Sequence, residues 1–435
     1  MGVGRVRHRK GETMRSLHRY AALVLVLFCV VACATANIPP IGTSPQPFQL
    51  AADEREIWER SEEEQQKLNR RGRLYQDPLL EEYINEIARR MTPPELQEQG
   101  VPIRVRILRD PSLNAFAYPN GAIYVHTGLL ARVENEAQLA SVLGHEMTHV
   151  INRDAVRQYR STRNKVIAAN VAAMAASIGI SAVAGEQWRQ GNAVSAAVIG
   201  QTANVMLGLG LQLGLLAAVN GYGRSMEDQA DVGAMRLMTQ AGYDINEAPK
   251  VHQMLLQRYG DPSRLENFFF GNHSRNQERI ENYQHLLSAE YAQVAQTSSL
   301  TTNTEEFQRR TRPLVRDNAI LDVEAGRYGT ARAALERVLA VVPSDAKAHF
   351  YLGELYRKQR RAPTDVEQAV LAYQKAAEHD PSYPDPQRSL GLLYYTTGRK
   401  DEARQAFERY LELKPHADDR QQVREYLMEL RHNPA

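Results

Sequence analysis

The sequence predicts a two-part chain in which a mostly helical α+β domain with a small sheet is followed by an all-α array of helical repeats. Three observations support this fold class. Apolar residues recur at helical spacing from residue 53 onward, residues 101–126 alternate as strands do, and three Ala-rich segments near the C-terminus align with one another. The length of 435 residues is too great for one typical core, which favours two domains.

Residues 1–32 are predicted to be a signal peptide. A basic start precedes an apolar run from Ala21 to Ala32 that is short for a membrane-spanning helix. The run ends in Val-Val-Ala-Cys33, which is typical of a bacterial lipobox, so we expect cleavage before Cys33 and a lipid on this cysteine. The alternative is a cut after Ala36, which would release a soluble periplasmic protein.

Charge and cysteine content narrow the function classes. Lys plus Arg is 53 against 51 Asp plus Glu, and a net charge of +2 argues against a dedicated nucleic-acid binder. The only cysteines are Cys29 and Cys33, and Cys29 lies in the removable segment. The mature chain therefore cannot form an intramolecular disulfide, and its stability must come from packing alone or from packing together with a metal.

Residues 33–52 are Pro-rich and are predicted to be a tether. Helical patterns follow, and residues 101–110 then alternate apolar and basic residues, as a half-buried strand does. The next stretch contains a turn at Pro119-Asn120-Gly121 and a strand that carries His126. We expect His126 to be a packing or surface residue rather than a metal ligand.

The segment GHEMTHV carries two histidines, His145 and His149, on one helix face, because residues four apart project on the same side. Asn135, with Gln138 three residues later, can cap this helix. A hydrolytic zinc site needs three protein ligands and a carboxylate near the reacting water. The two histidines supply two ligands and Glu146 is the natural base, so one ligand is missing from the motif.

Glu227 is the candidate for the third ligand. It lies near the start of a helix predicted from Ser225, and Asp231 one turn later can accept a hydrogen bond from a ligating imidazole. The alternative is that both residues only form an acidic first turn, which the helix dipole favours.

Between these two helices, residues 166–219 form an Ala/Gly-rich insert. Its length would allow two membrane spans, but Asn and Gln side chains interrupt it and alanine is only marginally apolar. Helices that are buried, touch a membrane or cover the cleft as a lid are favoured.

Residues 313–435 are predicted to be a repeat domain, and the polar residues 296–312 a linker. Three Ala-rich segments end shortly before Pro343, Pro381 and Pro415, and this spacing resembles tetratricopeptide repeats, which recur about every 34 residues. In tetratricopeptide repeats, helical pairs stack into a curved solenoid that offers a concave binding surface. The alternative is that the helical pairs of this chain merely cap the first domain.

Three motifs resemble those of one gluzincin metallopeptidase family, which includes HtpX, BepA and the CAAX prenyl protease. The motifs are Asn114-Ala115-Phe116-Ala117, His145-Glu146-Met147-Thr148-His149 and Arg224-Ser225-Met226-Glu227-Asp228-Gln229-Ala230-Asp231. This resemblance predicts a zincin-like metallopeptidase domain over residues 53–295. Together with the repeats, the architecture resembles the periplasmic BepA-type branch.

The resemblance implies one Zn²⁺ per chain, held by His145, His149 and Glu227, with Glu146 as the catalytic base. Asp231 would hold a ligating imidazole, and Asn114, Ala115, Phe116 and Ala117 would lie on an edge strand that pairs with an extended substrate. The segment NHSRNQERI resembles a later His-Pro-x-x-x-x-Arg-Ile element, with Ser274 in place of the proline. It implies that His273 stabilises the oxyanion or binds the zinc, whereas a lone loop histidine is otherwise a surface residue.

The function that follows from this resemblance is a zinc endopeptidase of the bacterial periplasm, anchored to the outer membrane through Cys33. It would degrade misfolded or stalled envelope proteins in outer-membrane protein quality control. The repeats would dock substrates or an outer-membrane assembly complex. The main alternative is a chaperone or assembly factor that acts by binding through the repeats. A membrane-embedded prenyl-protein protease would need several long apolar spans, which this chain lacks.

Overall fold

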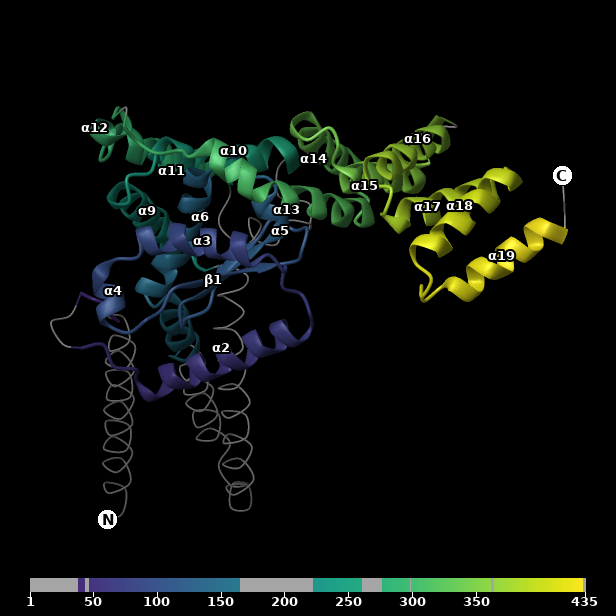
Figure 1. Cartoon of the computed structure of the whole chain (residues 1–435). Helices are drawn as coiled ribbons and strands as arrows, with labels where there is room; N and C mark the ends of the chain where they lie inside the picture. The colour runs from purple at the N-terminus through teal and green to yellow at the C-terminus, as the bar shows by residue number, and fades with distance from the viewer. Residues whose placement is uncertain are drawn as a thin grey trace, which may run out of the picture.

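The computed structural model describes residues 38–43, 47–164, 222–259, 276–297, 299–360 and 364–432. The predicted signal peptide, Cys33 and the insert 166–219 lie outside these residues. Within them the chain forms a helical domain that contains a small sheet, and an array of helices extends from one side of it (Figure 1).

The first part of the chain consists of helices around one sheet. Its elements are α2 (Ala52–Arg70), α3 (Pro78–Met91), α4 (Pro94–Glu98), β1 (Arg104–Leu108), β2 (Ala115–Ala117), β3 (Ala122–His126), α5 (Thr127–Leu130), α6 (Glu136–Ile151), α9 (Arg224–Gln240), η1 (Ile245–Glu247), α10 (Ala248–Tyr259), α11 (Asn276–Ser288) and α12 (Ala292–Ala295).

The sheet has the strand order β1-β3-β2, with β1 parallel and β2 antiparallel to the central strand β3. The turn between β2 and β3 contains Gly121, whose φ of +86° favours glycine. A Cβ at this position would lie 2.2 Å from the carbonyl oxygen of Pro102. The predicted turn therefore forms, and the strand order places β2 at the edge of the sheet.

Both faces of the sheet are covered. One face places Val105, Ile123 and Ala115 in the main core of the domain. The other face forms an aromatic cluster in which the Phe116 and Tyr124 rings stack across the strands at 5.5 Å between centroids. Leu68 of α2 packs on this cluster. Because β3 is covered on both faces, all its residues are buried, including His126.

Helix α6 is the centre of the domain, and every residue in it is buried. It packs against α3, α9, α10 and the sheet. Asn135 is its N-cap and accepts a hydrogen bond from the backbone N–H of Gln138 at 2.8 Å, as the sequence predicts. The Gln138 side chain accepts from the backbone N–H of Glu134, so the two residues together satisfy the start of the helix.

The start of α9 differs from the prediction. The sequence predicts a start at Ser225 with Ser225 and Asp228 as a capping pair, but the helix begins at Arg224 with Gly223 as N-cap and no side chain caps it, so this prediction is wrong. Ser225 instead lies exposed within the first turn. This register places Glu227 inside the domain, where its Oε1 accepts a hydrogen bond from the Tyr222 backbone N–H at 2.9 Å.

Residues 38–43 and 47–50, which the sequence assigns to the tether, lie against the domain. Ile38 and Ile41 are buried, and the Ile41 backbone N–H donates to the carbonyl of Ile151 at the end of α6 at 2.8 Å. Apolar residues in this Pro-rich stretch thus attach it to the domain, and packing within the described residues begins before α2.

The second part of the chain is a stack of helices that extends away from the domain (Figure 1). It comprises α13 (Thr304–Glu324), α14 (Tyr328–Val341), α15 (Ala346–Gln359), α16 (Thr364–His379), α17 (Pro384–Thr396), α18 (Lys400–Leu413) and α19 (Arg420–His432). Consecutive helices pack on one another, as helical pairs in a solenoid do.

The predicted linker, residues 296–312, is structured where it is described. Its second half forms the beginning of α13, and the carbonyl of Thr302 accepts hydrogen bonds from the backbone N–H groups of Glu136 and Ala137 at 3.1 and 3.3 Å. The fully buried Glu136 carboxylate also accepts from the Asn303 side chain. The segment that enters the repeats is therefore bonded to the N-terminus of α6.

A buried ion pair fixes the first repeat helix to the domain. Arg132 donates to both oxygens of Asp322 on α13, at 2.7 and 2.8 Å, and the two side chains are at most 2% exposed. Arg327 and Asn318 donate to the same carboxylate. The Arg132 bonds to Asp322 join the two parts, and those from Arg327 and Asn318 hold the carboxylate in place within the repeats.

We expect Asp322→Ala to lower the free energy of unfolding by about 3–5 kcal/mol, because it leaves the Arg132 guanidinium buried without its partner. Urea unfolding followed by circular dichroism measures this effect. Glu324→Ala is the matched control, because Glu324 lies on the same helix and is exposed. Equal unfolding midpoints for the two variants would contradict the role of this ion pair.

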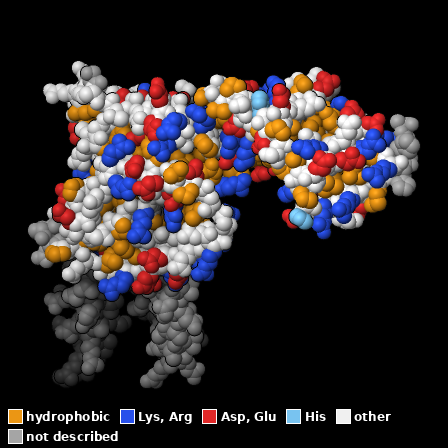
Figure 2. Space-filling view, viewed as in Figure 1, with side chains coloured by type: hydrophobic (Ala, Val, Ile, Leu, Met, Phe, Trp, Pro, Cys, Tyr) orange, Lys and Arg blue, Asp and Glu red, His pale blue; other side chains and the backbone are white. Residues whose placement is uncertain are grey.

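No helix among the described residues is both long and apolar enough to cross a membrane. The face shown in Figure 2 carries acidic and basic side chains interspersed over both parts of the molecule.

Candidate metal centre

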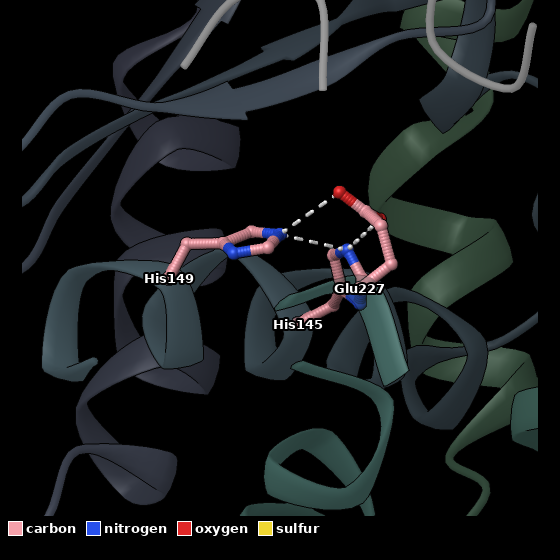
Figure 3. Close-up of side chains that lie close together, drawn as sticks. All are labelled: His145, His149 and Glu227. Atoms are coloured by element: carbon pink, nitrogen blue, oxygen red, sulfur yellow. Dashed lines mark hydrogen bonds and ion pairs between the residues drawn. The ribbon is translucent and has the colours of Figure 1, made fainter. Parts of the chain in front are cut away.

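Three side chains from two helices converge inside the domain (Figure 3). His145 and His149 project from the same face of α6, and Glu227 projects from the first turns of α9. One ligand atom of each residue lies within 4.8 Å of the other two, and all three residues are buried. The three residues predicted as ligands are thus brought together, although nearly eighty positions separate Glu227 from His149.

The spacing of these atoms suits a small divalent ion. The Nε2 atoms of the two imidazoles lie 3.1 Å apart, and Nε2 of His145 lies 3.3 Å from Glu227 Oε2. Nε2 of His149 lies 3.7 Å from Glu227 Oε1. Ligands at about 2.0–2.1 Å in a tetrahedral zinc site are separated by about 3.3 Å. The residues present therefore fit a metal ion.

Asp231 lies behind His145 as predicted. Its Oδ1 is 3.0 Å from Nδ1 of His145, which leaves Nε2 directed at the other ligands. Arg279 and Tyr283 of α11 both donate hydrogen bonds to the Asp231 carboxylate, the Tyr283 hydroxyl at 2.8 Å and the Arg279 Nε at 3.0 Å. The carboxylate, being held on both sides, fixes the imidazole orientation and tautomer.

The electrostatics of the site favour a cation. Burial and the Arg279 guanidinium act to lower the pKa of His145, but its hydrogen bonds to Asp231 and Glu227 outweigh them and raise this pKa to about 9. The pKa of Asp231 is lowered despite burial, because Arg279 and His145 stabilise its charge. A positive charge between the imidazoles and Glu227 is therefore stabilised by its surroundings.

Glu146 has the properties of a general base. It is 2% exposed, and its Oε1 has no hydrogen-bond partner among the described residues. Burying an unpaired carboxylate oxygen costs free energy, so a functional role is the natural reason for this arrangement. Burial raises the pKa of Glu146 to about 7, with His145 and His149 opposing this rise and Glu227 adding to it. A carboxylate that gains and loses a proton near neutral pH suits proton transfer.

Two residues that lie near the ligands are not predicted from the sequence to contact the site. Arg279 lies in the quoted NHSRNQERI segment, but its sequence position does not reveal that it contacts Asp231. Asp154 lies beside His149, with its Oδ2 2.8 Å from Nδ1. The signal for Asp154 is weak, because an acid five residues after a histidine falls on another helix face unless the helix has ended.

Tyr222 flanks the other side of His149. The two ring centroids are 4.3 Å apart, and the tyrosine is buried. Burial raises the pKa of Tyr222 well above its usual value, and the charges of Asp154, Glu146 and Glu227 add to this effect. The phenol therefore stays protonated. Tyr118 is a second tyrosine near the site in sequence, but it belongs to the aromatic cluster of Phe116 and Tyr124 on the sheet face away from the main core.

The close approach of α6 and α9 depends on a glycine. A Cβ on Gly233 would lie 2.3 Å from the Thr148 side chain, which belongs to the HExxH segment. Gly233 thus lets α9 approach α6 closely enough for Glu227 to meet the two histidines.

The residues predicted to bind substrate lie at the edge of the sheet. Ala115, Phe116 and Ala117 form β2, Asn114 precedes it, and β2 contacts α6. The backbone groups of Asn114 and Tyr118 pair with β3, so those of Ala115 and Ala117 face the opposite side. His126, whose Nδ1 lies 2.7 Å from the Ser112 hydroxyl, is not part of the cluster. His273 lies outside the described residues.

Comparison with known proteins agrees with this site. Residues 76–287 match the family model described as Peptidase family M48, and residues 316–365 and 364–418 match the Tetratricopeptide repeat model. The first match contains the three converging ligands. The expected fold, an α+β metallopeptidase domain followed by all-α repeats, is confirmed.

Alignments with individual relatives differ in length. The chain is 24% identical over 361 residues to the beta-barrel assembly-enhancing protease of Escherichia coli (strain K12), covering 78% of this chain and 69% of that protein. It is 29% identical over 183 residues to a Vibrio cholerae protein described as a beta-barrel assembly-enhancing protease, covering 42% and 34%. Mitochondrial metalloendopeptidase OMA1 of Schizosaccharomyces pombe is 28% identical over 195 residues, covering 45% and 49%.

The last two alignments span less than half of the relatives' own lengths. All three relatives are described as proteases or endopeptidases, in agreement with the geometry of the HExxH helix and Glu227. Residues 76–287 of the chain therefore form a metallopeptidase domain of the family M48 type, and tetratricopeptide repeats follow this domain.

Proposed function

We propose that the chain is a zinc-dependent endopeptidase that cleaves unfolded or misassembled proteins of the bacterial envelope. The observation that carries this proposal is the convergence of His145, His149 and Glu227, together with a buried Glu146 whose Oε1 lacks a hydrogen-bond partner among the described residues. Two imidazoles and one carboxylate in tetrahedral spacing are the donor set of hydrolytic zinc sites.

A bound zinc ion would polarise the scissile carbonyl as a Lewis acid. The Glu146 carboxylate accepts a proton from the attacking water and later returns it to the leaving amine, so that its charge state is the same before and after the reaction. His145 and His149 keep their Nε2 atoms directed at the site because each Nδ1 faces a buried carboxylate. We keep His273 as a candidate donor to the oxyanion.

The edge strand β2 supports an extended substrate. Asn114, Ala115, Phe116 and Ala117 lie beside the metal-binding helix, and the outward N–H and C=O groups of Ala115 and Ala117 have no backbone partner among the described residues. A substrate strand added here would bind through main-chain hydrogen bonds. Such binding requires a segment without its own secondary structure, which explains a preference for unfolded proteins.

The proposed location in the envelope, at the outer membrane, is based on the relatives and on the N-terminal sequence. The Escherichia coli relative is described as a beta-barrel assembly-enhancing protease. We propose that this chain works in the periplasm, in outer-membrane protein quality control, with lipidated Cys33 as its anchor. The repeats would dock an outer-membrane assembly complex or substrates, because stacked helical pairs present an extended binding surface.

The test is a cleavage assay with an outer-membrane β-barrel protein in two states, unfolded in dilute urea and folded in detergent micelles. We expect fragments from the unfolded state only, loss of cleavage after zinc is removed with a chelator, and recovery when Zn²⁺ is added back. Cleavage that survives complete removal of zinc would contradict the metallopeptidase mechanism. Equal cleavage of the folded barrel would contradict the proposed substrate class.

A chaperone role through the repeats is the second candidate, and the joint between α13 and the peptidase domain supports it. The repeats are attached by the buried Arg132–Asp322 pair and by the bonds of Thr302 and Asn303 to α6. They are therefore placed to hold a partner beside the peptidase domain. Rescue of cells that lack the protein by a cleavage-deficient variant would favour this function.

A further inference from the structure

Asp154 is a buried acid whose position the sequence does not explain. Its carboxylate is fully buried, and Oδ2 lies 2.8 Å from Nδ1 of His149, the nitrogen that faces away from the ligand cluster. Its other oxygen, Oδ1, accepts a hydrogen bond from Arg157 at 2.8 Å. The arrangement resembles the one behind His145, where Asp231 contacts Nδ1 of the imidazole and is bonded to Arg279, which also lies 3.0 Å from the same Nδ1.

The turn after α6 brings Asp154 back to the helix. α6 ends at Ile151, and Arg153 has a φ of +56°, in the left-handed region that side chains other than glycine rarely adopt. This conformation reverses the chain so that Asp154 lies beneath the imidazole of His149. Without the reversal, a residue five positions after His149 would lie on a different face of the helix.

An ion pair holds this turn in place. The Arg153 guanidinium donates to both carboxylate oxygens of Glu54 on α2, with Nε at 2.9 Å and Nη2 at 2.5 Å, and Glu54 is 1% exposed. Arg153 also donates to the carbonyl of Pro39 at 3.3 Å. The unusual backbone conformation is thus stabilised by contacts with two segments near the N-terminus of the described chain.

We propose that Asp154 is a positioning residue for the metal centre: it accepts a hydrogen bond from Nδ1–H of His149 and thereby fixes Nε2 as the ligand atom. This inference rests on the proposed zinc site. A carboxylate behind a ligating imidazole sets its tautomer and ring orientation and increases its basicity. With Asp231 behind His145, both histidine ligands then have a carboxylate partner, and each carboxylate is itself held by an arginine.

The test is the zinc affinity of the purified chain, measured by competition with a chromophoric chelator. We expect Asp154→Ala to weaken zinc binding about 10- to 100-fold. Asp154→Asn should weaken it less, because the amide oxygen can still accept from Nδ1–H. A second readout is the visible absorption of the Co²⁺-substituted protein, whose band should shift when His149 is no longer held in one orientation.

Asp228→Ala is the matched control, because Asp228 lies on α9 between Glu227 and Asp231 but bonds to the Asn282 side chain. Circular dichroism reports whether each variant is folded, and the asparagine variant, which is nearly isosteric, keeps the test valid if the alanine variant is not. Folded Asp154 variants that bind zinc as tightly as the unchanged protein, with the same Co²⁺ spectrum, would overturn the proposal and leave the zinc site intact. Absence of zinc binding by the unchanged protein would overturn the proposed function as well.

Discussion

Glu146→Gln is expected to lower kcat by about 10²–10⁴-fold while the chain keeps its zinc, because glutamine fills the same space but cannot accept a proton from water. The buried position of Glu146 between the two histidine ligands carries this expectation. Initial rates of cleavage of an unfolded substrate and zinc content by elemental analysis are measured on the same preparation.

Glu134→Gln is the control for this substitution, because Glu134 is exposed just before α6. It should leave both cleavage and zinc content unchanged. Cleavage by Glu146→Gln at the rate of the unchanged protein would refute the assignment of the base. If this variant cannot cleave and still restores function in cells, the binding role of the repeats is the more important one.

Glu227→Ala and His149→Ala are each expected to reduce the zinc content from one per chain to none. A protein zinc site of this class needs three ligands, and two remaining side chains cannot retain the ion through dialysis. The ligand atoms come from two helices that are far apart in the sequence, so the loss in both variants would establish the discontinuous site.

Exposed residues of the same types serve as controls. His285 and Glu281 lie on α11 and are exposed, so the variants His285→Ala and Glu281→Ala should keep one zinc per chain. Full zinc content in folded Glu227→Ala would exclude this residue as the third ligand. Zinc bound equally well by His149→Ala would place the metal elsewhere.

Much of this site could be predicted from the sequence. The four-residue spacing of His145 and His149 places both on one face of a helix whatever surrounds it, and Asn135 fixes where that helix begins. Glu227 and Asp231 are indicated first by their one-turn spacing at a helix start and then by the order of the family motifs, because no local rule brings α9 to α6. The repeats were visible in the spacing of three similar segments.

Other features depend on contacts that no short segment contains. Asp154 reaches His149 only because Arg153 adopts a left-handed conformation, and a turn made by arginine lacks the usual glycine signal. Arg279 contacts Asp231 across two helices. Ile38 and Ile41 lie in a Pro-rich stretch that predicts a tether, yet they are buried on the domain.

The bond between Thr302 and the N-terminus of α6 has a consequence for how substrates are presented. The repeats join the peptidase domain through hydrogen bonds of Thr302 and the buried Arg132–Asp322 pair, so a partner held by them would have a fixed distance from His145, His149 and Glu227. A polypeptide captured on the repeats then has a high effective concentration at the active site only if its free segment matches that distance. The reach of a client, rather than its sequence alone, would decide which of its peptide bonds are cleaved.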